Sequence, residues 1–229
     1  MKTYSILLAL LIILLTSNII NTQEDTSNHK YIANEKLSNS ELQERVKAYN
    51  SWLNKESESN SLELRIDSNS ELSVFTTKKI NKDGNLLEQP KKLLISPNLV
   101  YETKYGTKLK EIEEKYGYDD LANLVIFFIG EFYNKESFYK PYFDVIPRDS
   151  SFIPNYWEDS KWIEEELKGF TLMRKIVDYK VEVEKKARGF DSGLFKQFPD
   201  VFDETIFNSK NVEWVISFVE GNINYVEYQ

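Results

Sequence analysis

Few side chains in this sequence could act as nucleophiles or metal ligands. The chain has no cysteine and a single histidine, His29, which lies in a polar stretch near the N-terminus. A structural zinc site needs several Cys or His ligands, so it is excluded, as are disulfides and a cysteine nucleophile. A Ser-His-Asp triad needs a histidine beside its nucleophile, and we interpret His29 as an ordinary solvated residue. We assign no catalytic residue and no metal ligand to this sequence.

The carboxylate-rich segment 159–169 contains three consecutive glutamates, Glu164, Glu165 and Glu166. Paired catalytic carboxylates face each other across a pocket, whereas three neighbours on one helix point to different sides. The segment therefore predicts a short surface helix that ends at Gly169, which suits a C-cap, and not an acid–base pair.

Aromatic side chains are concentrated in the segment 121–157, which opens with the apolar block 121–129. This block is hydrophobic on nearly every side, which is typical of a buried core helix, and it is shorter than the roughly 20 residues that span a bilayer. Pro141 lacks a backbone N–H and disfavours helical geometry at the residue before it, so we expect an extended crossover segment at Pro141 after the helix. On physical grounds alone, core packing explains the whole segment.

Short strands are expected between Leu62 and Ser96. Leu62, Leu64 and Ile66 alternate with charged residues, which is the period-2 pattern of a half-buried strand. The pair Asp83-Gly84 suits a tight turn. Further strands are expected at 72–77, 86–90 and 92–96.

Helices are expected before and after these strands. Ser38 or Ser40 can cap a helix that ends near Leu53. The switch to helical period near Pro97 predicts an α+β fold, with short antiparallel strands beside a larger helical region. The later expected helices cover 97–117 with a C-cap at Gly117, 121–129 with a cap at Asp119 or Asp120, 170–187, and a last one that begins at Asn208 or Ser209. The buried seam expected over 170–187 is Leu172, Ile176, Tyr179 and Val183.

Composition favours a folded protein that binds no nucleic acid. The chain has 229 residues, of which 41% are hydrophobic and 14% aromatic, enough for a sizeable core in one domain. Its net charge is -8, whereas nucleic-acid binding would require a basic patch. An acidic balance favours basic partners, although solubility alone also explains it.

The N-terminal 22 residues have the pattern of a secretory signal peptide. One lysine, Lys2, precedes an apolar run over 5–15, and small polar residues follow at Thr16 and Ser17. The prediction is a secreted protein without membrane contact after the signal is removed. The alternative is a membrane anchor that extends through Ile20. The polar segment 23–38 is predicted to be a disordered spacer.

Several short motifs follow one another in a set order from residue 41 onward. Besides the core helix, they are Tyr49-Asn50-Ser51-Trp52-Leu53, Thr77-Lys78-Lys79-Ile80 with Leu87-Glu88-Gln89-Pro90, Ser137-Phe138-Tyr139-Lys140-Pro141-Tyr142, Ile146-Pro147, Pro154-Asn155-Tyr156-Trp157, and Trp214 with Ser217 and Val219. This order resembles the SET-domain methyltransferases of the RuBisCO large-subunit and actin-histidine type. The resemblance implies a SET fold with a helical insert, S-adenosylmethionine as cofactor and a protein as substrate or partner.

Three positions depart from the family pattern where the resemblance places the cofactor. Ser73 stands in place of a glycine that lets the backbone approach the cofactor, and Phe75 replaces a frequently basic residue. Asn222 stands where the family has an arginine that reaches the cofactor carboxylate. Asparagine lacks both the charge and the two-pronged geometry of arginine. We therefore predict that S-adenosylmethionine binds weakly or not at all, and we assign no cofactor-binding residue.

The resemblance stops before the catalytic half of the family. That half carries an Asn-His-Ser motif and a later Tyr-Gly motif, and this sequence matches neither. We therefore interpret 39–229 as the N-terminal part of an incomplete SET-like domain without activity of its own. Two alternatives stay open: a fragment of an active S-adenosylmethionine-dependent protein methyltransferase, and a non-enzymatic secretory module that binds a protein.

Overall fold

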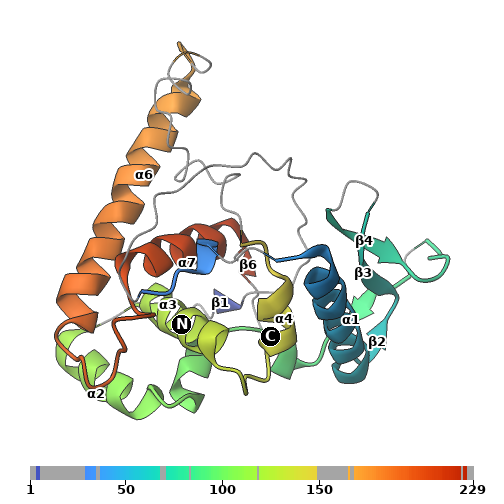
Figure 1. The fold of residues 1–229 in the computed structure, drawn as a ribbon, viewed down its shortest axis with the longest axis horizontal. Helices are drawn as coiled ribbons and strands as arrows, with labels where there is room; N and C mark the ends of the chain where they lie inside the picture. Colours follow the sequence, from blue (N-terminus) through green and yellow to red (C-terminus); the bar gives the residue numbers. More distant parts are fainter. Residues whose placement is uncertain are drawn as a thin grey trace.

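The computed structural model describes residues 4–5, 29–34, 37–67, 71–82, 84–117, 119–148, 165, 168–222 and 224–225. Helices form most of it, and the longest pair of antiparallel strands lies to one side, as Figure 1 shows. This α+β arrangement confirms the predicted fold class. Most of the predicted signal peptide (1–22) and of the predicted surface helix (159–169) lies outside the described residues.

Helix α3 (Asp120–Tyr133) forms the centre of the core, as the apolar block predicts. Asp119 caps it, because its side chain accepts a hydrogen bond from the Ala122 N–H at 2.9 Å. Helix α7 (Ser209–Asn222) packs beside α3. The ring pairs Phe128–Phe218 and Phe132–Trp214 join the two helices.

Helix α1 (Asn39–Glu56) begins where the sequence indicates. Ser38 and Glu41 form a reciprocal capping box that satisfies two of the free N–H groups at the helix start. Helix α1 packs against α4 (Lys140–Val145) and against strand β3 (Leu62–Ile66). The Asn50 side chain bonds both the N–H and the C=O of Leu64, at 2.8 Å each, and so fixes the strand to the helix.

The strands form three two-stranded antiparallel sheets in the described part of the chain. The longest pair is β3 (Leu62–Ile66) with β4 (Leu72–Thr76), in a register that places Leu64 opposite Val74. Strand β3 confirms the strand predicted from the period-2 pattern of 62–66, and β4 confirms the strand predicted over 72–77. The other pairs are β2 (Ser59–Asn60) with β5 (Leu87–Glu88), and β1 (Tyr4–Ser5) with β6 (Asn224–Tyr225).

The strand predicted over 92–96 is wrong. This segment begins with the 3-10 helix η2 (Lys91–Leu93), whose turns close through bonds from Leu93 N–H to Pro90 C=O and from Leu94 N–H to Lys91 C=O. Leu93 and Ile95 are both fully buried. The apolar residues that predicted a strand are instead core residues of a 3-10 turn and the segment after it. Over so few residues, the apolar pattern of a buried turn cannot be told from that of a strand.

The single helix predicted over 97–117 is divided in two. A 3-10 helix, η3 (Pro97–Glu102), precedes α2 (Gly106–Tyr116). The chain folds back tightly between them, since a Cβ on Gly106 would lie 2.2 Å from the Tyr101 carbonyl oxygen. The predicted C-cap is confirmed: Gly117 has φ 67 and donates its N–H to Glu113 C=O.

The extended crossover predicted at Pro141 is a short helix instead. Pro141 lies in the first turn of α4, where its missing N–H breaks no helical hydrogen bond. Phe143 and Val145 of α4 are buried. Proline therefore marks the start of a new helix here, since α3 has already ended at Tyr133.

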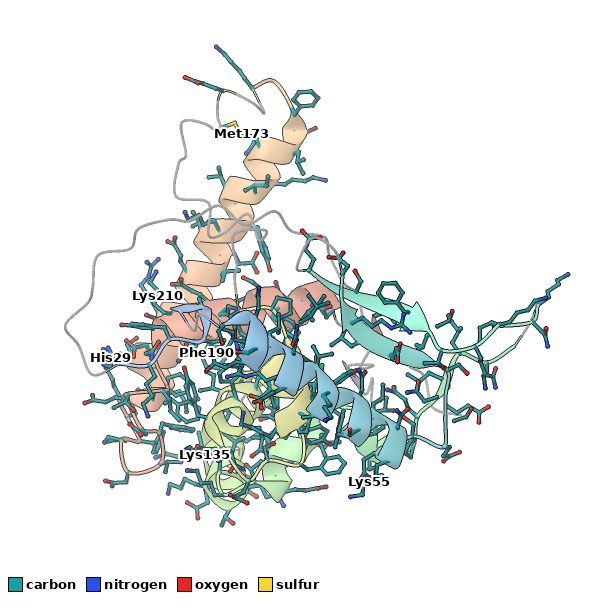
Figure 2. All side chains as sticks on the ribbon, turned by 45° about the vertical axis from the view of Figure 1, so that its right-hand side comes forward. His29, Lys55, Lys135, Met173, Phe190 and Lys210 are labelled. Atoms are coloured by element: carbon teal, nitrogen blue, oxygen red, sulfur yellow. The ribbon has the colours of Figure 1, made fainter. Side chains whose placement is uncertain are left out.

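Helix α6 (Thr171–Phe190) stands away from the rest of the molecule over most of its length, as Figure 1 shows. Figure 2 places Met173 at its far end and Phe190 against the body. The predicted buried seam is wrong at Leu172, which is 54% exposed, and correct at Val183, which is 1% exposed. A π-helix, η5 (Asp191–Phe195), follows α6 directly.

The predicted disordered spacer over 23–38 is partly ordered. A 3-10 helix, η1 (Ile32–Asn34), follows Lys30, and the Ile32 side chain is 1% exposed. The Ile32 N–H donates to Asn211 Oδ1 of α7 at 2.9 Å. The sequence does not reveal this contact, because the few apolar residues of this polar segment show no helical or strand periodicity. His29, just before it, is exposed, as predicted.

Candidate functional site

The β3–β4 hairpin carries the first two positions that the resemblance assigns to the cofactor. Ser73 lies opposite Arg65, and its hydroxyl is 3.4 Å from the Asp67 carboxylate. Phe75 is 37% exposed, and the Arg65 guanidinium carbon lies 4.9 Å from the centre of its ring. Arg65 also pairs with Glu63, which is directly opposite Phe75. The side chains of Glu63 and Arg65 therefore cover the face of the hairpin that carries Ser73 and Phe75.

Asn222, the third of these positions, lies at the C-terminal end of α7. Its Nδ2 donates to the Phe218 carbonyl oxygen one helical turn back, at 2.7 Å. The amide therefore completes its own helix end, where carbonyl groups otherwise have no partner. In Figure 1 the hairpin lies beside α1, on a different side of the molecule from α7, which carries Asn222 at its C-terminal end.

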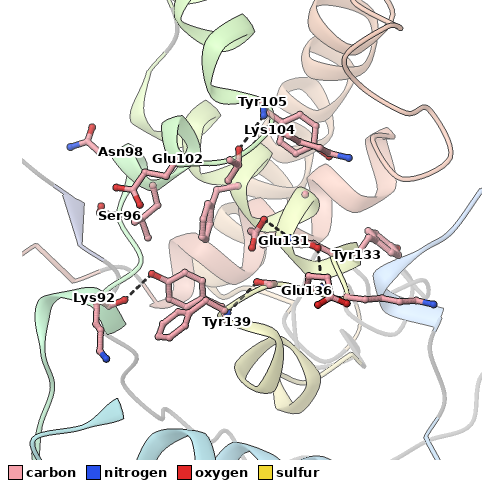
Figure 3. Close-up of a pocket in the computed structure, with 18 of the residues that line it drawn as sticks. Lys92, Ser96, Asn98, Glu102, Lys104, Tyr105, Glu131, Tyr133, Glu136 and Tyr139 are labelled. Atoms are coloured by element: carbon pink, nitrogen blue, oxygen red, sulfur yellow. Dashed lines mark hydrogen bonds between the residues drawn. The ribbon is translucent and has the colours of Figure 1, made fainter. Parts of the chain in front are cut away.

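A groove of about 1350 Å³ lies on another side of the core. One wall is formed by η2, η3 and the turn before α2, and the other by the end of α3 and the corner that leads into α4, as Figure 3 shows. Its apolar lining consists of Leu94, Leu99, Tyr105, Phe127, Tyr133, Phe138, Tyr139 and Ile206.

Tyr139 forms the floor of this groove. It is 7% exposed, and its hydroxyl donates to the Lys92 carbonyl oxygen at 2.9 Å, which ties the two walls together. Burial raises the pKa of Tyr139 to about 12, with further contributions from the negative charges of Glu102 and Glu131. The phenol therefore stays protonated at neutral pH and acts as a hydrogen-bond donor.

One wall depends on the close approach of Tyr105 to Gly130. A Cβ at position 130 would lie 2.4 Å from the Tyr105 ring, so glycine is needed there. Tyr105 is 4% exposed, and burial, followed by the charges of Glu131 and Asp203, raises its pKa to about 12. Both tyrosines are therefore neutral aromatic surfaces under ordinary conditions.

The lining of the groove offers charged and aromatic side chains that could hold a ligand. It contains no cysteine or histidine, and its buried tyrosines are held in the protonated state. Within the described ranges, no group of three or more His, Cys, Asp or Glu residues could hold a metal ion. Carboxylates and aromatic rings in a half-open groove are suited to hold a ligand by charge and contact.

The sequence pattern predicts core packing for the segment that contains Phe138 and Tyr139. The structure confirms this for Tyr139, which is buried, but not for Phe138, which is 42% exposed in the lining of the groove. Glu131 was not singled out. The available signal was the Gly130-Glu131 pair, which interrupts an otherwise apolar helix.

Comparison with solved structures identifies the architecture. No protein family model matches the sequence, and no curated protein matches it. The structure of Rubisco LSMT bound to sinefungin and monomethyllysine matches with a TM-score of 0.58 at 19% identity. The fold is SET-like. The match covers 75% of this chain and 39% of the other, so the chain spans about two fifths of that protein.

This similarity confirms the predicted α+β architecture with short antiparallel strands and a helical insert. At 19% identity it shows the fold alone. The shared fold does not itself assign an activity, because function depends on the site built on a fold.

Proposed function

We propose that this chain is a SET-like protein of the RuBisCO large-subunit and actin-histidine methyltransferase type that binds a protein partner. In this proposal it binds S-adenosylmethionine weakly or not at all and transfers no methyl group by itself. The single observation that carries the proposal is the state of Asn222, whose amide is bonded to its own helix.

An arginine at this position would bind a carboxylate through two parallel hydrogen bonds. Losing such a buried, charge-assisted contact costs about 2–5 kcal/mol. By the usual ~1.4 kcal/mol per factor of ten, the affinity for the cofactor falls by roughly 30-fold or more. Phe75 acts in the same direction, because its ring and Arg65 cover the strand that would approach the cofactor.

The second candidate function is S-adenosylmethionine-dependent protein methylation. It is favoured by one observation, the shared fold with Rubisco LSMT, whose structure holds sinefungin and monomethyllysine. Sinefungin is an analogue of S-adenosylmethionine. The two functions differ in whether this chain binds the cofactor.

Isothermal titration of the 229-residue chain with S-adenosylmethionine and with sinefungin separates the two functions. We expect no saturable binding in the low micromolar range. A low micromolar dissociation constant for either ligand would overturn the proposal and support the methyltransferase.

The double variant S73G/N222R tests whether these positions alone prevent activity. We expect no methylated product, because transfer also requires the methyl group and its acceptor to be held within reacting distance. The motifs that the resemblance assigns to that task have no match here. Methylated product detected by mass spectrometry with the double variant, and not with the parent chain, would contradict this.

We further propose that the protein enters the secretory pathway and loses about its first 22 residues. Among the described residues, no helix combines the length and apolar character needed to cross a bilayer. Intact-mass measurement on protein purified from its source should find Met1 and Lys2 absent. Their presence would favour the alternative of an N-terminal membrane anchor.

A further inference from the structure

We propose that the outward face of helix α6 pairs with the same face of a second copy of this chain, with the two helices antiparallel. The inference goes beyond the proposed function and does not depend on it, because Ser73, Phe75 and Asn222 lie on other elements. It concerns the part of α6 that stands away from the body in Figure 1. In such a symmetric dimer each copy offers the same surface to the other.

One stripe of α6 side chains faces away from α7. Val183 is 1% exposed, whereas Val177 is 47% and Val181 56% exposed. Residues that are alternately four and three positions apart share one side of a helix, and this is the spacing by which one helix packs along another. The stripe with this spacing consists of Phe170, Arg174, Val177, Val181, Glu184 and Arg188.

The described part of the chain leaves this stripe uncovered. Among the described elements, α6 packs closely only on α7 and on η5, which follows it. Phe170, at the N-cap of α6, is 66% exposed, so an aromatic ring and two valines lie in water along one line. Single exposed apolar residues are ordinary on a protein surface, but an aligned set is typical of an interaction surface.

An antiparallel second copy matches the stripe residue by residue. In this arrangement Val177 faces Val181 of the second copy, and Arg174 faces its Glu184. The two-fold symmetry makes each contact occur twice. The four valines therefore form an apolar centre with an ion pair on each side, so that both the shape and the charge of the stripe are complementary to themselves.

The charges of the stripe oppose a parallel pair. Parallel helices would place Arg174 against Arg174, Glu184 against Glu184 and Arg188 against Arg188, and like charges repel. In the antiparallel pair, Arg188 lies instead beside the Phe170 ring of the second copy, where a cation is attracted to the aromatic face. The sequence of the stripe thus selects one orientation of one partner.

Ion pairs within α6 do not consume these charges. Arg174 lies 3.7 Å from Asp178, and Arg188 lies 3.8 Å from Glu184, each one helical turn away. The Arg174 side chain is 88% exposed, and exposed pairs of this kind contribute little to stability. A second copy would exclude water from the same charges, and their attraction strengthens where the surroundings are less polar than water.

The contact is small, so the dimer is weak and reversible. Phe170 to Arg188 spans about 27 Å of helix. One pair of helices of this length buries less surface than the roughly 1,600 Å² of a standard stable interface, and we expect a Kd of about 10–100 µM. Stability measured at about 1 µM therefore reports on the monomer. The two bodies lie at opposite ends of the helix pair, because α7 packs on α6 near Lys186.

Sedimentation velocity of the 229-residue chain from about 1 to about 300 µM tests the proposal. We expect the mass to rise from monomer to dimer over this range. V177E/V181E should raise the Kd at least about tenfold, because it buries charge in the apolar centre. The matched control is Leu86→Glu, at a 45% exposed residue outside α6, which should leave the Kd unchanged. A chain that stays monomeric throughout, or a dimer that survives V177E/V181E, would overturn the proposal.

Charge reversal tests the pairing of Arg174 with Glu184. R174E and E184R each create two like-charge contacts in the dimer, so each variant alone should dimerise at least about tenfold more weakly. An equimolar mixture should recover the affinity of the parent chain, because each variant supplies the charge that the other lacks. Circular dichroism of both variants checks that α6 is retained. A mixture that stays monomeric while both variants are fully helical would refute this pairing.

Disulfide cross-linking tests the orientation, since the chain has no cysteine of its own. In a buffer of oxidised and reduced glutathione, R174C mixed with E184C should form a linked dimer at least about tenfold more readily than R174C alone. The reason is that the two copies of position 174 lie about 15 Å apart along antiparallel helices. Equal or preferred linkage of R174C to itself would show a parallel pair and contradict the proposed arrangement.

Discussion

Asn211 shows how much one buried polar residue contributes to this fold. Its Oδ1 accepts the Ile32 N–H at 2.9 Å, and its Nδ2 donates to the carbonyl oxygens of Lys30 and Ile206 at 2.9 and 2.7 Å. The residue is 1% exposed. It therefore satisfies backbone groups from two distant parts of the chain that would otherwise be buried without partners.

Replacing Asn211 with leucine should lower the free energy of unfolding by roughly 3 kcal/mol. Leucine fills a similar volume but leaves the buried N–H and carbonyl groups unpaired, at about 1–3 kcal/mol for each. Urea denaturation measures the change, and limited proteolysis should show faster cleavage near Lys30. The control is Asn85→Leu at an exposed position. A loss below about 0.5 kcal/mol would show that Asn211 does not hold the N-terminal segment.

At the scale of elements, contacts decide which face of a helix is buried. Helix α6 packs on α7 only near its C-terminal end, where Lys186 bonds Glu220 at 3.2 Å. Val183 is 1% exposed, while Val181, two residues earlier, is 56% exposed. Residues two apart project from nearly opposite sides of a helix, and α7 covers only the side that carries Val183.

This pair of valines gives a matched test. Val183→Ser should lower the free energy of unfolding by about 2 kcal/mol or more, because it removes buried apolar contacts and buries a hydroxyl. Val181→Ser should change it by less than about 0.5 kcal/mol. Thermal and urea denaturation of both variants check the difference. Equal losses would mean that the exposed half of α6 is covered in solution.

The wall of the groove depends on two elements that approach closely. Gly130→Ala should lower the free energy of unfolding by about 1–3 kcal/mol, because its Cβ would meet the Tyr105 ring at 2.4 Å. Gly221→Ala is the control in α7, since a Cβ there meets nothing within 4 Å. That change should be neutral or slightly stabilising, because alanine favours helix. If the first variant were as stable as the second, the Tyr105 ring would have to be free to move away.

At the scale of the whole molecule, buried tyrosines limit stability at high pH. Burial raises the pKa of both Tyr105 and Tyr139 to about 12, and it also raises the pKa values of Tyr49 and Tyr142. In the unfolded chain a tyrosine ionises near pH 10. Between pH 10 and 12 the unfolded state therefore holds fewer protons than the folded state, and stability falls as pH rises.

Each such tyrosine should lower the free energy of unfolding by about 1.4 kcal/mol per pH unit in this interval. The stabilising difference is fully present below pH 10. Urea denaturation at intervals from pH 8 to 12 measures the slope. Tyr139→Phe removes one titrating group and should make the slope shallower, although it also loses the bond to Lys92 C=O. An unchanged slope in this variant would show that Tyr139 is not protected from ionisation.

The sequence alone determined the elements whose signals are local. Capping residues such as Ser38 and Asp119 fixed the starts of α1 and α3, because a side chain bonds a backbone group only three residues away. Alternation predicted β3, and the largely apolar block 121–129 predicted the core helix. The fold class followed from the switch in period, and the order of aromatic and proline residues led to the SET-like resemblance.

Only the tertiary structure decided which apolar residues are buried and where a ligand could bind. Leu172 and Val183 belong to the same helical seam, yet α7 covers only Val183. Glu102 of η3 and Glu131 of α3 line opposite walls of the same groove. The Ile32 N–H bonds Asn211, which is 179 residues away in the sequence. Such pairings have no local signature, because they depend on how distant segments pack and not on the period of any one of them.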